Sequence, residues 1–213
     1  PLNGVILLVD MANLFSSTEQ QRRDLAVVLR ARLTELGGEL GTRLPLYVVM
    51  SKFDLLDGFE ALFARLAARE REEVQGFTFT LGSVTAFDAW QEELGKAYQA
   101  FVERLGIHLM KATDAAPRSA RKRAYSLLRE LSGANEMLQG FLGDVLGSDR
   151  YSTPALVRGL YFSSVYQRGE VRNLLADASA RAFAFDPPAL SIKPQGTSVV
   201  YFAQQLLQRV VYP

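Results

Sequence analysis

A chain of 213 residues is long enough for one large domain, or for one domain with a smaller subdomain. With 48% hydrophobic and 22% charged residues, it has the composition of an ordinary globular protein and not of a disordered one. Its 24 basic and 23 acidic side chains give a formal charge of +1, so no global field selects nucleic acid or a membrane. Cysteine is absent, which excludes disulfides, thiolate metal sites and cysteine nucleophiles.

Three short apolar runs in the first part of the chain predict strands. Gly4–Asp10 ("GVILLVD") is a continuous apolar run closed by an acid, which is typical of a buried strand. Leu46–Met50 and Gly76–Leu81 are the second and third predicted strands. Helices between them give a β-α-β-α-β order, which favours parallel neighbours with a ligand edge at the carboxyl ends of the strands.

Two amphipathic helices are predicted between these strands. The first follows "SSTEQQ", where Ser16 and Glu19 have the spacing of a capping box, and it ends at Gly37–Gly38, which suits a C-cap. The second helix is followed by an exposed "AREREE" and carries its apolar side chains at helical spacing, namely Phe59, Leu62, Phe63 and Leu66.

The second half of the chain is predicted to be mainly helical. Apolar residues at helical spacing, beginning with Phe87, indicate several helices from about Ser83 to Gly147. Strand chemistry returns at Val157–Tyr166, followed by a helix from about Glu170, a Pro/Gly-rich loop ("DPPALSIKPQGTS") and a closing helix ("VVYFAQQLLQRVVY"). We therefore expect an α/β domain over residues 1–82, a helical subdomain over 83–150, and a returning strand with C-terminal helices over 151–213.

The second predicted strand runs directly into Ser51-Lys52-Phe53-Asp54. A K-x-D pattern after a buried strand binds the base in GTP-binding proteins, where the Asp accepts two hydrogen bonds from guanine and the Lys stem lies along the ring. Here Ser51 takes the place of an Asn or Thr. The alternative is an ordinary strand-to-helix turn, in which Asp54 caps the next helix and the stem of Lys52 covers apolar surface.

The rest of a nucleotide site is missing from the sequence. A phosphate-binding loop needs G-x-x-x-x-G-K-[ST], and the one Gly-Lys pair, Gly95-Lys96, lies in a predicted helix without that pattern. His108 is the sole histidine, so a zinc site of the usual kinds is excluded and a structural role is expected. We expect neither a catalytic residue nor a metal ligand in this chain.

One basic patch is present, formed by Lys111, Arg118, Arg121, Lys122 and Arg123. Clusters of about four to eight basic residues can meet anionic lipid headgroups, and an acidic partner would serve equally. Because no aromatic residues are interleaved, we do not expect a nucleic-acid platform. A solvated start of a helix is the structural alternative.

Five blocks in this order and at these spacings together resemble the cytoplasmic region of the IcmF/TssM family: "PLNGVILLVD", "LPLYVVMSKFDLLDGFEALFARL", "REEVQGFTF", "LVRGLYFSSVYQRG" and "YFAQQLLQRVVYP". That family supplies the inner-membrane core component of type VI secretion systems. The resemblance covers essentially the whole chain. It implies an α/β fold with a partial P-loop GTPase-like parallel sheet and a mainly helical extension.

The resemblance also implies partners and cofactors. Family members are membrane-anchored and join TssL and TssJ proteins in a complex that docks the baseplate, so TssL-like, TssJ-like and baseplate proteins are the expected partners. Many members carry a phosphate-binding loop upstream of the block that matches Pro1 to Asp10, so GTP or ATP with Mg²⁺ would belong to a complete domain. No cofactor is expected in this chain, whose start at Pro1 predicts a fragment.

By carry-over from the family motif, Lys52 and Asp54 match the base-recognition residues and Ser51 its hydroxyl position. The expected function is a scaffold on the cytoplasmic side of the inner membrane. The main rival is an NTPase that powers or gates secretion and depends on the upstream loop. A third interpretation is a module that senses a nucleotide by binding it without hydrolysis. A fragment that lacks upstream strands would expose the edge of the Gly4–Asp10 strand, and such an edge favours self-association.

Overall fold

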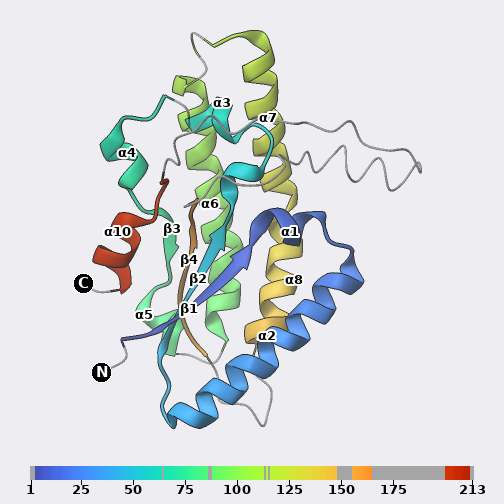
Figure 1. Ribbon diagram of the computed structural model, residues 1–213, viewed down its shortest axis with the longest axis vertical. Coiled ribbons are helices and arrows are strands. Elements are labelled where there is room, and N and C mark those ends of the chain that lie inside the picture. Colours follow the sequence, from blue (N-terminus) through green and yellow to red (C-terminus); the bar gives the residue numbers. More distant parts are fainter. Residues whose placement is uncertain are drawn as a thin grey trace.

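The computed structural model describes residues 3–63, 65–85, 88–112, 114, 116–147, 155–164 and 200–211. Within them, four strands form one central sheet surrounded by helices (Figure 1). The strands are β1 (Val5–Asp10), β2 (Pro45–Ser51), β3 (Gln75–Thr78) and β4 (Leu156–Phe162). The helices and helical turns are α1 (Met11–Ser16), α2 (Glu19–Leu40), η1 (Phe53–Leu55), α3 (Phe59–Phe63), α4 (Ala68–Glu72), α5 (Leu81–Thr85), α6 (Ala89–Ala112), α7 (Arg118–Gly133), α8 (Asn135–Leu146), α10 (Gln204–Leu206) and η2 (Leu207–Val211).

The sheet is mixed, in the order β1-β2-β4-β3. Strands β1, β2 and β4 are parallel, whereas β3 pairs antiparallel with β4 at the outer edge. The expected α/β class and the three early strands are confirmed, but the expectation of a wholly parallel sheet is wrong. The β-α-β pattern specifies the elements and not their spatial order, and β4, which comes much later in the chain, takes the place beside β2. The likeness to a P-loop GTPase sheet stays a prediction.

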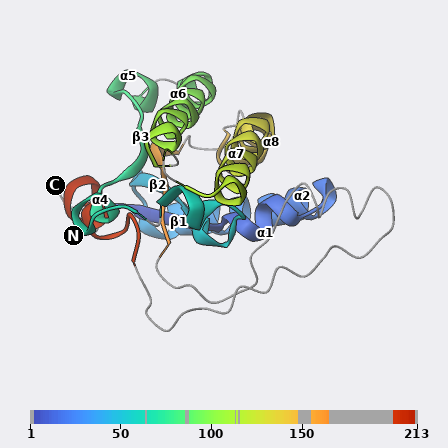
Figure 2. The same cartoon turned by 90° about the horizontal axis from the view of Figure 1, so that it is seen from above.

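The two faces of the sheet are covered by different parts of the chain. Side chains alternate between faces along each strand. One face packs against α6, α7 and α8, which Figure 2 shows stacked on one side of the sheet. The opposite face carries a second apolar cluster that includes C-terminal residues: Tyr47, Val49, Tyr161, Leu206 and Val211.

Strand β1 lies at a free edge of the sheet, with β2 as its neighbour among the described strands. Its Leu7 and Val9 are buried, but Ile6 and Leu8 point to the other face and are 41% and 64% exposed. The C-terminal turns cover β2 and β4 on that face and leave these two side chains in solvent. Among the described strands, the outer edge of β1 therefore has no neighbour.

Helices α6, α7 and α8 confirm the helical stretch predicted from about Ser83 to Gly147. Their apolar faces join the sheet in one core, in which the Tyr98 hydroxyl donates a 2.9 Å hydrogen bond to the Leu131 carbonyl. Gly58 lets α7 approach closely, since a Cβ there would lie 2.3 Å from the Arg123 oxygen. The domain boundaries at residues 82 and 150 stay predictions.

The first predicted helix differs from α2 at both ends. Its N-cap is Thr18, whose capping-box partner is Gln21, because the residues up to Ser16 form the separate helix α1. Its C-cap is Gly41, with φ of 60°, so the predicted end at Gly37–Gly38 is wrong. Both glycines remain helical, and the helix ends where a left-handed glycine satisfies the last carbonyls.

Two further expectations change in detail, and others fall on residues that the structure does not describe. The second predicted helix is two short helices, α3 with its core-facing phenylalanines and α4 with no buried residue. The predicted helix from Glu170, the Pro/Gly-rich loop and Phe87 lie outside the described residues. The closing helix begins only at Gln204, because Tyr201 pairs with Ser164 in an isolated bridge.

No helix in the described ranges is long and apolar enough to cross a membrane.

Candidate functional site

Polar residues follow three neighbouring parallel strands at their carboxyl ends. Asp10 closes β1, Ser51 closes β2, and Ser163 and Ser164 come directly after β4. The register places Asp10 opposite Ser51, and the Ser163 N–H donates a 2.9 Å hydrogen bond to the Met50 carbonyl. Parallel strands deliver their ends to the same edge, so residues far apart in the sequence meet there.

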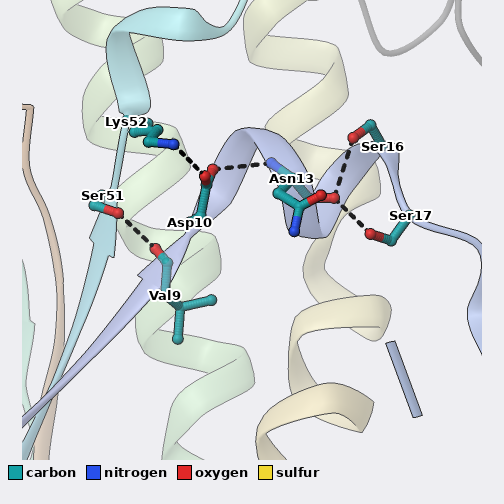
Figure 3. A network of polar contacts seen from close by, with 7 residues as sticks. All are labelled: Val9, Asp10, Asn13, Ser16, Ser17, Ser51 and Lys52. Carbon is teal, nitrogen blue, oxygen red and sulfur yellow. Dashed lines mark hydrogen bonds and ion pairs between the residues drawn. The ribbon is translucent and has the colours of Figure 1, made fainter. Parts of the chain in front are cut away.

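The lysine of the K-x-D pattern is bound to the end of β1 (Figure 3). Lys52 Nζ lies 2.5 Å from Asp10 Oδ2, and the two side chains are 47% and 32% exposed. The other carboxylate oxygen, Asp10 Oδ1, accepts a 3.0 Å hydrogen bond from the Asn13 N–H and so caps α1. One carboxylate therefore holds the start of a helix and the lysine of the neighbouring strand.

The serine of the pattern joins the same two strands. Ser51 Oγ donates a 3.1 Å hydrogen bond to the Val9 carbonyl (Figure 3). The next residue, Lys52, has φ of 58°, a left-handed conformation that is uncommon for a residue with a side chain. Phe53, which follows, is completely buried and packs against Phe162 with ring centroids 5.5 Å apart. The sharp turn at Lys52 thus sends the chain from the sheet into the core.

The aspartate of the pattern is bound to the residue after β4. Ser164 Oγ donates a hydrogen bond to Asp54 Oδ1, and the backbone of Ser164 is held by Tyr201 through bonds of 3.1 and 2.7 Å. Burial raises the pKa of Asp54, while the hydrogen bond from Ser164 and the charge of Lys52 oppose the rise. We call Asp10, Ser51, Lys52, Asp54 and Ser164 the strand-end clasp.

The geometry bears on the turn interpretation of the K-x-D pattern, one of the two that the sequence leaves open. In the turn interpretation, Asp54 caps a helix, but it lies in the first turn of η1, whose N-cap is Lys52 with no capping side chain. The stem of Lys52 was expected to cover apolar surface, yet its amine makes an ion pair. Ser164 was missed, although two serines directly after an apolar strand were the signal for polar groups at this edge.

The chain matches the IcmF-related N-terminal domain over residues 1–213. It belongs to the IcmF-related family. It is 31% identical to the type VI secretion system component TssM1 of Pseudomonas aeruginosa over 219 residues, which cover 100% of the chain and 19% of TssM1. No solved structure matches the chain. The family resemblance seen in the sequence blocks is confirmed, and the domain spans about a fifth of the length of this relative.

In this IcmF-related domain, the clasp has its hydrogen-bonding groups directed at each other. A guanine base would need two acceptor positions on Asp54, and Ser164 already donates to one of its oxygens. The amine of Lys52 is engaged by Asp10. The arrangement thus joins the ends of β1, β2 and β4 through side-chain contacts. The base-binding roles of Ser51, Lys52 and Asp54 stay predictions.

The other residues singled out in the sequence lie away from the clasp. The ring of His108, on α6, is stacked at 5.9 Å and 20° on Phe63. In the described part of the chain, no group of three or more His, Asp or Glu could hold a metal ion. The basic residues lie near the end of α6 and the start of α7, and all are exposed: Lys111, Arg118, Arg121, Lys122 and Arg123.

A shallow depression of about 200 Å³ lies near α4 and α10 and includes no residue of the clasp. That volume is below the roughly 300–1,000 Å³ of typical small-molecule pockets. Its lining mixes small apolar side chains with two charged ones and a glutamine: Ala68, Arg71, Glu72, Val200, Ala203 and Gln204. The depression offers no convergent polar groups in an apolar setting, so we assign it no ligand.

Proposed function

We propose that this IcmF-related domain is a scaffold segment of a type VI secretion membrane complex, placed on the cytoplasmic side of the inner membrane. Its match to the family over residues 1–213 and its similarity to TssM1, a named component of such a system, support this placement. In this role the domain offers folded surfaces to other proteins of the apparatus. TssL-like and TssJ-like proteins and baseplate components are the proposed members of that assembly.

One observation favours a scaffold over a nucleotide-driven motor. The side chains that a base-binding motif would turn toward a ligand are used inside the domain, with Lys52 on Asp10 and Asp54 on Ser164. These contacts link the ends of β1, β2 and β4. A fixed arrangement of strands, rather than a site that opens and closes, is what a docking module needs.

The NTPase alternative requires parts that these 213 residues do not supply. Their sequence has no G-x-x-x-x-G-K-[ST] segment to hold phosphates. A base would also have to take Lys52 from Asp10 and share Asp54 with Ser164. A nucleotide would therefore lose favourable contacts of the domain in exchange for its own, without the phosphate contacts that give nucleotides most of their affinity.

The scaffold role is tested by retention of partner proteins. We expect the immobilised domain to retain the purified cytoplasmic part of a TssL-like protein, or a purified baseplate protein, from the same secretion system. Lys52→Met should retain the partner equally well, because the clasp shapes the sheet and is not itself the docking surface. If neither protein is retained by the domain or by a longer chain that contains it, the scaffold proposal is wrong.

The NTPase alternative is tested by calorimetric titration of the same domain with GTP and with ATP, each with Mg²⁺. We expect no binding at micromolar concentrations. Micromolar binding that is lost in Lys52→Met and in Asp54→Asn would assign a nucleotide to this edge and overturn the structural role of the clasp. Because retention of partners and binding of nucleotide are measured separately, the two outcomes cannot be confused.

A further inference from the structure

The exposed face of α7 carries an unbroken run of positive charge. From Arg118 to Arg129 the sequence contains five basic residues and no acidic one. Helical spacing of three and four residues puts Arg118, Arg121 and Lys122 on the side opposite Ala124, Leu127 and Leu131, which are buried. The basic side chains are exposed. The charged side chains that this part of the helix presents to solvent are therefore all positive.

Large apolar side chains are exposed on α6 and α7. Ile107 and Met110 on α6 are 57% and 65% exposed, and Tyr125 on α7 is 53% exposed. Figures 1 and 2 show α6 and α7 side by side, and a Cβ at Gly106 would lie 3.4 Å from Leu128. With Gly106 of α6 level with Leu128 of α7 in this antiparallel pair, the last turns of α6 lie beside the middle of α7.

Spacing along α6 adds a further basic residue to the same region. Ile107, Met110 and Lys111 share one face at intervals of three and four residues. The nearest acidic groups along the chain are Asp114, which is exposed, and Glu103, which accepts a hydrogen bond from Gln99. On α7, Glu130 is buried. Along these two helices, positive charge thus prevails where α6 ends and α7 begins, a region that we call the α6–α7 tip.

We propose that the α6–α7 tip docks on the surface of a bilayer that contains anionic lipids. Arg118, Arg121, Lys122 and Lys111 would lie against the headgroups, while Ile107, Met110 and Tyr125 enter the boundary with the acyl chains. Basic residues next to exposed apolar ones are the composition of interfacial helices. A single-stranded nucleic acid would call for several stacking aromatics, and Tyr125 is the one aromatic on these faces.

The lipid surface explains the pairing of charge with aliphatic side chains better than an acidic protein does. An acidic protein surface would satisfy the arginines and lysines but gives Ile107 and Met110 no specific reason to be exposed. A bilayer uses both, because affinity for the interface grows with buried apolar area as well as with charge. This inference concerns lipid and not the partner proteins proposed above, so it can fail while the scaffold role holds.

Co-sedimentation with vesicles tests the proposal. The whole domain is mixed with vesicles made of equal parts phosphatidylglycerol and phosphatidylethanolamine, and in parallel with vesicles of phosphatidylcholine alone. We expect binding to the first and not to the second, and a marked loss of binding at high salt because surface charges are screened. Equal binding to both vesicle types, or to neither, overturns the proposal.

Two variants and a control locate the surface. Removing three charges with Arg118→Ser, Arg121→Ser and Lys122→Ser should weaken binding roughly 100-fold, at about fivefold per basic residue. Ile107→Ser with Met110→Ser keeps the charge and should weaken binding by about tenfold or more. The control removes three exposed basic residues elsewhere, namely Arg23, Arg32 and Arg69.

The control separates a local surface from net charge, because both triple variants lower the formal charge of +1 by three. We expect the control to bind vesicles almost as well as the unmodified domain. If it loses as much binding as the α7 triple variant, the attraction belongs to the whole domain and the proposal is wrong. If the α7 triple variant loses an acidic protein partner but not vesicles, the surface docks protein and the lipid proposal is also overturned.

Discussion

Lys52 Nζ lies 2.5 Å from Asp10 Oδ2, and the two residues, 42 positions apart in the sequence, meet at the ends of two parallel strands. The same carboxylate caps α1, so the pair ties β2 to the point where β1 turns into a helix. A motif whose lysine would lie along a nucleotide base in GTP-binding proteins here holds two strands together. We therefore expect substitution of Lys52 to change the stability of the domain before any other property.

The coupling between Lys52 and Asp10 is measurable in a double-mutant cycle. Asp10→Asn keeps an acceptor for the α1 cap and removes the charge, and Lys52→Met removes the amine. Because both side chains are partly exposed, we expect a coupling free energy of about 0.2–1 kcal/mol in urea unfolding. Asp10→Ala should cost about 1 kcal/mol more than Asp10→Asn, since it also removes the cap. No coupling within error would show that the ion pair does not form in solution.

The left-handed backbone at Lys52 predicts an unusual order of stabilities. Lys52→Ala and Lys52→Gly both lose the ion pair, but only glycine adopts φ of 58° without steric cost. We expect Lys52→Gly to be more stable than Lys52→Ala by about 1 kcal/mol, measured by urea or thermal unfolding. In most exposed positions outside helices the two would differ less. Alanine equal to or better than glycine would mean that the turn has another conformation.

Asp54 predicts a pH-dependent stability with a definite sign. Burial raises its folded pKa above the unfolded value of 3.8, so the folded state holds the proton more tightly. Its stabilising contribution is therefore complete below pH 3.8 and is lost as the pH rises through the folded pKa. Asp54→Asn keeps an acceptor for Ser164 and does not titrate. The unfolding free energy of the unmodified domain minus that of Asp54→Asn should fall with rising pH across this window.

Ser164→Ala sharpens this test. The hydroxyl of Ser164 stabilises the charged carboxylate of Asp54, so its removal should raise the pKa of Asp54 further and move the window to higher pH. Urea unfolding at a series of pH values measures both variants. A stability difference between the unmodified domain and Asp54→Asn that does not change with pH would contradict the prediction.

Three glycines near the end of α2 should respond in opposite directions. A Cβ at Gly37 or Gly38 meets no atom within 4 Å, and both lie inside the helix, so alanine at either should stabilise by about 0.5–1 kcal/mol. Gly41 has φ of 60°, so Gly41→Ala should destabilise by about 1–2 kcal/mol. Thermal unfolding of the three variants checks the position of the helix end. Destabilisation by Gly37→Ala would indicate that α2 ends at Gly37–Gly38 and not at Gly41.

The free edge of the sheet predicts self-association at high concentration. Strand β1 is apolar and unpaired on one side among the described strands, and Leu8 is 64% exposed. Leu8→Lys places a charge there and should shift the domain toward the monomer in sedimentation velocity. Val27→Lys, at an exposed residue of α2, is the matched control and should leave association unchanged. Equal effects of the two variants would locate the contact elsewhere.

Much of this architecture could be predicted from local patterns. Apolar runs such as Gly4–Asp10 located the first two strands within one residue, whereas the third strand ends at Thr78, three residues before its predicted end at Leu81. The carboxyl-edge rule correctly put Asp10 and Ser51–Asp54 together. The same patterns misplaced the end of α2, because Gly37, Gly38 and Gly41 are all plausible caps until the backbone is seen. The pairing of Asp54 with Ser164 was not predicted, since the two are separated by 110 residues.

The sequence by itself determined the α/β class, the strands and the family, because periodicity and ordered blocks are properties of neighbouring residues. Only the tertiary structure decided that β4 lies between β2 and β3 and that β3 runs antiparallel. It also decided that Lys52 faces Asp10 and Asp54 faces Ser164. The physical reason is that strand order and side-chain partners depend on which distant segments bury their apolar faces together. The spacing of neighbouring residues does not specify that long-range pairing.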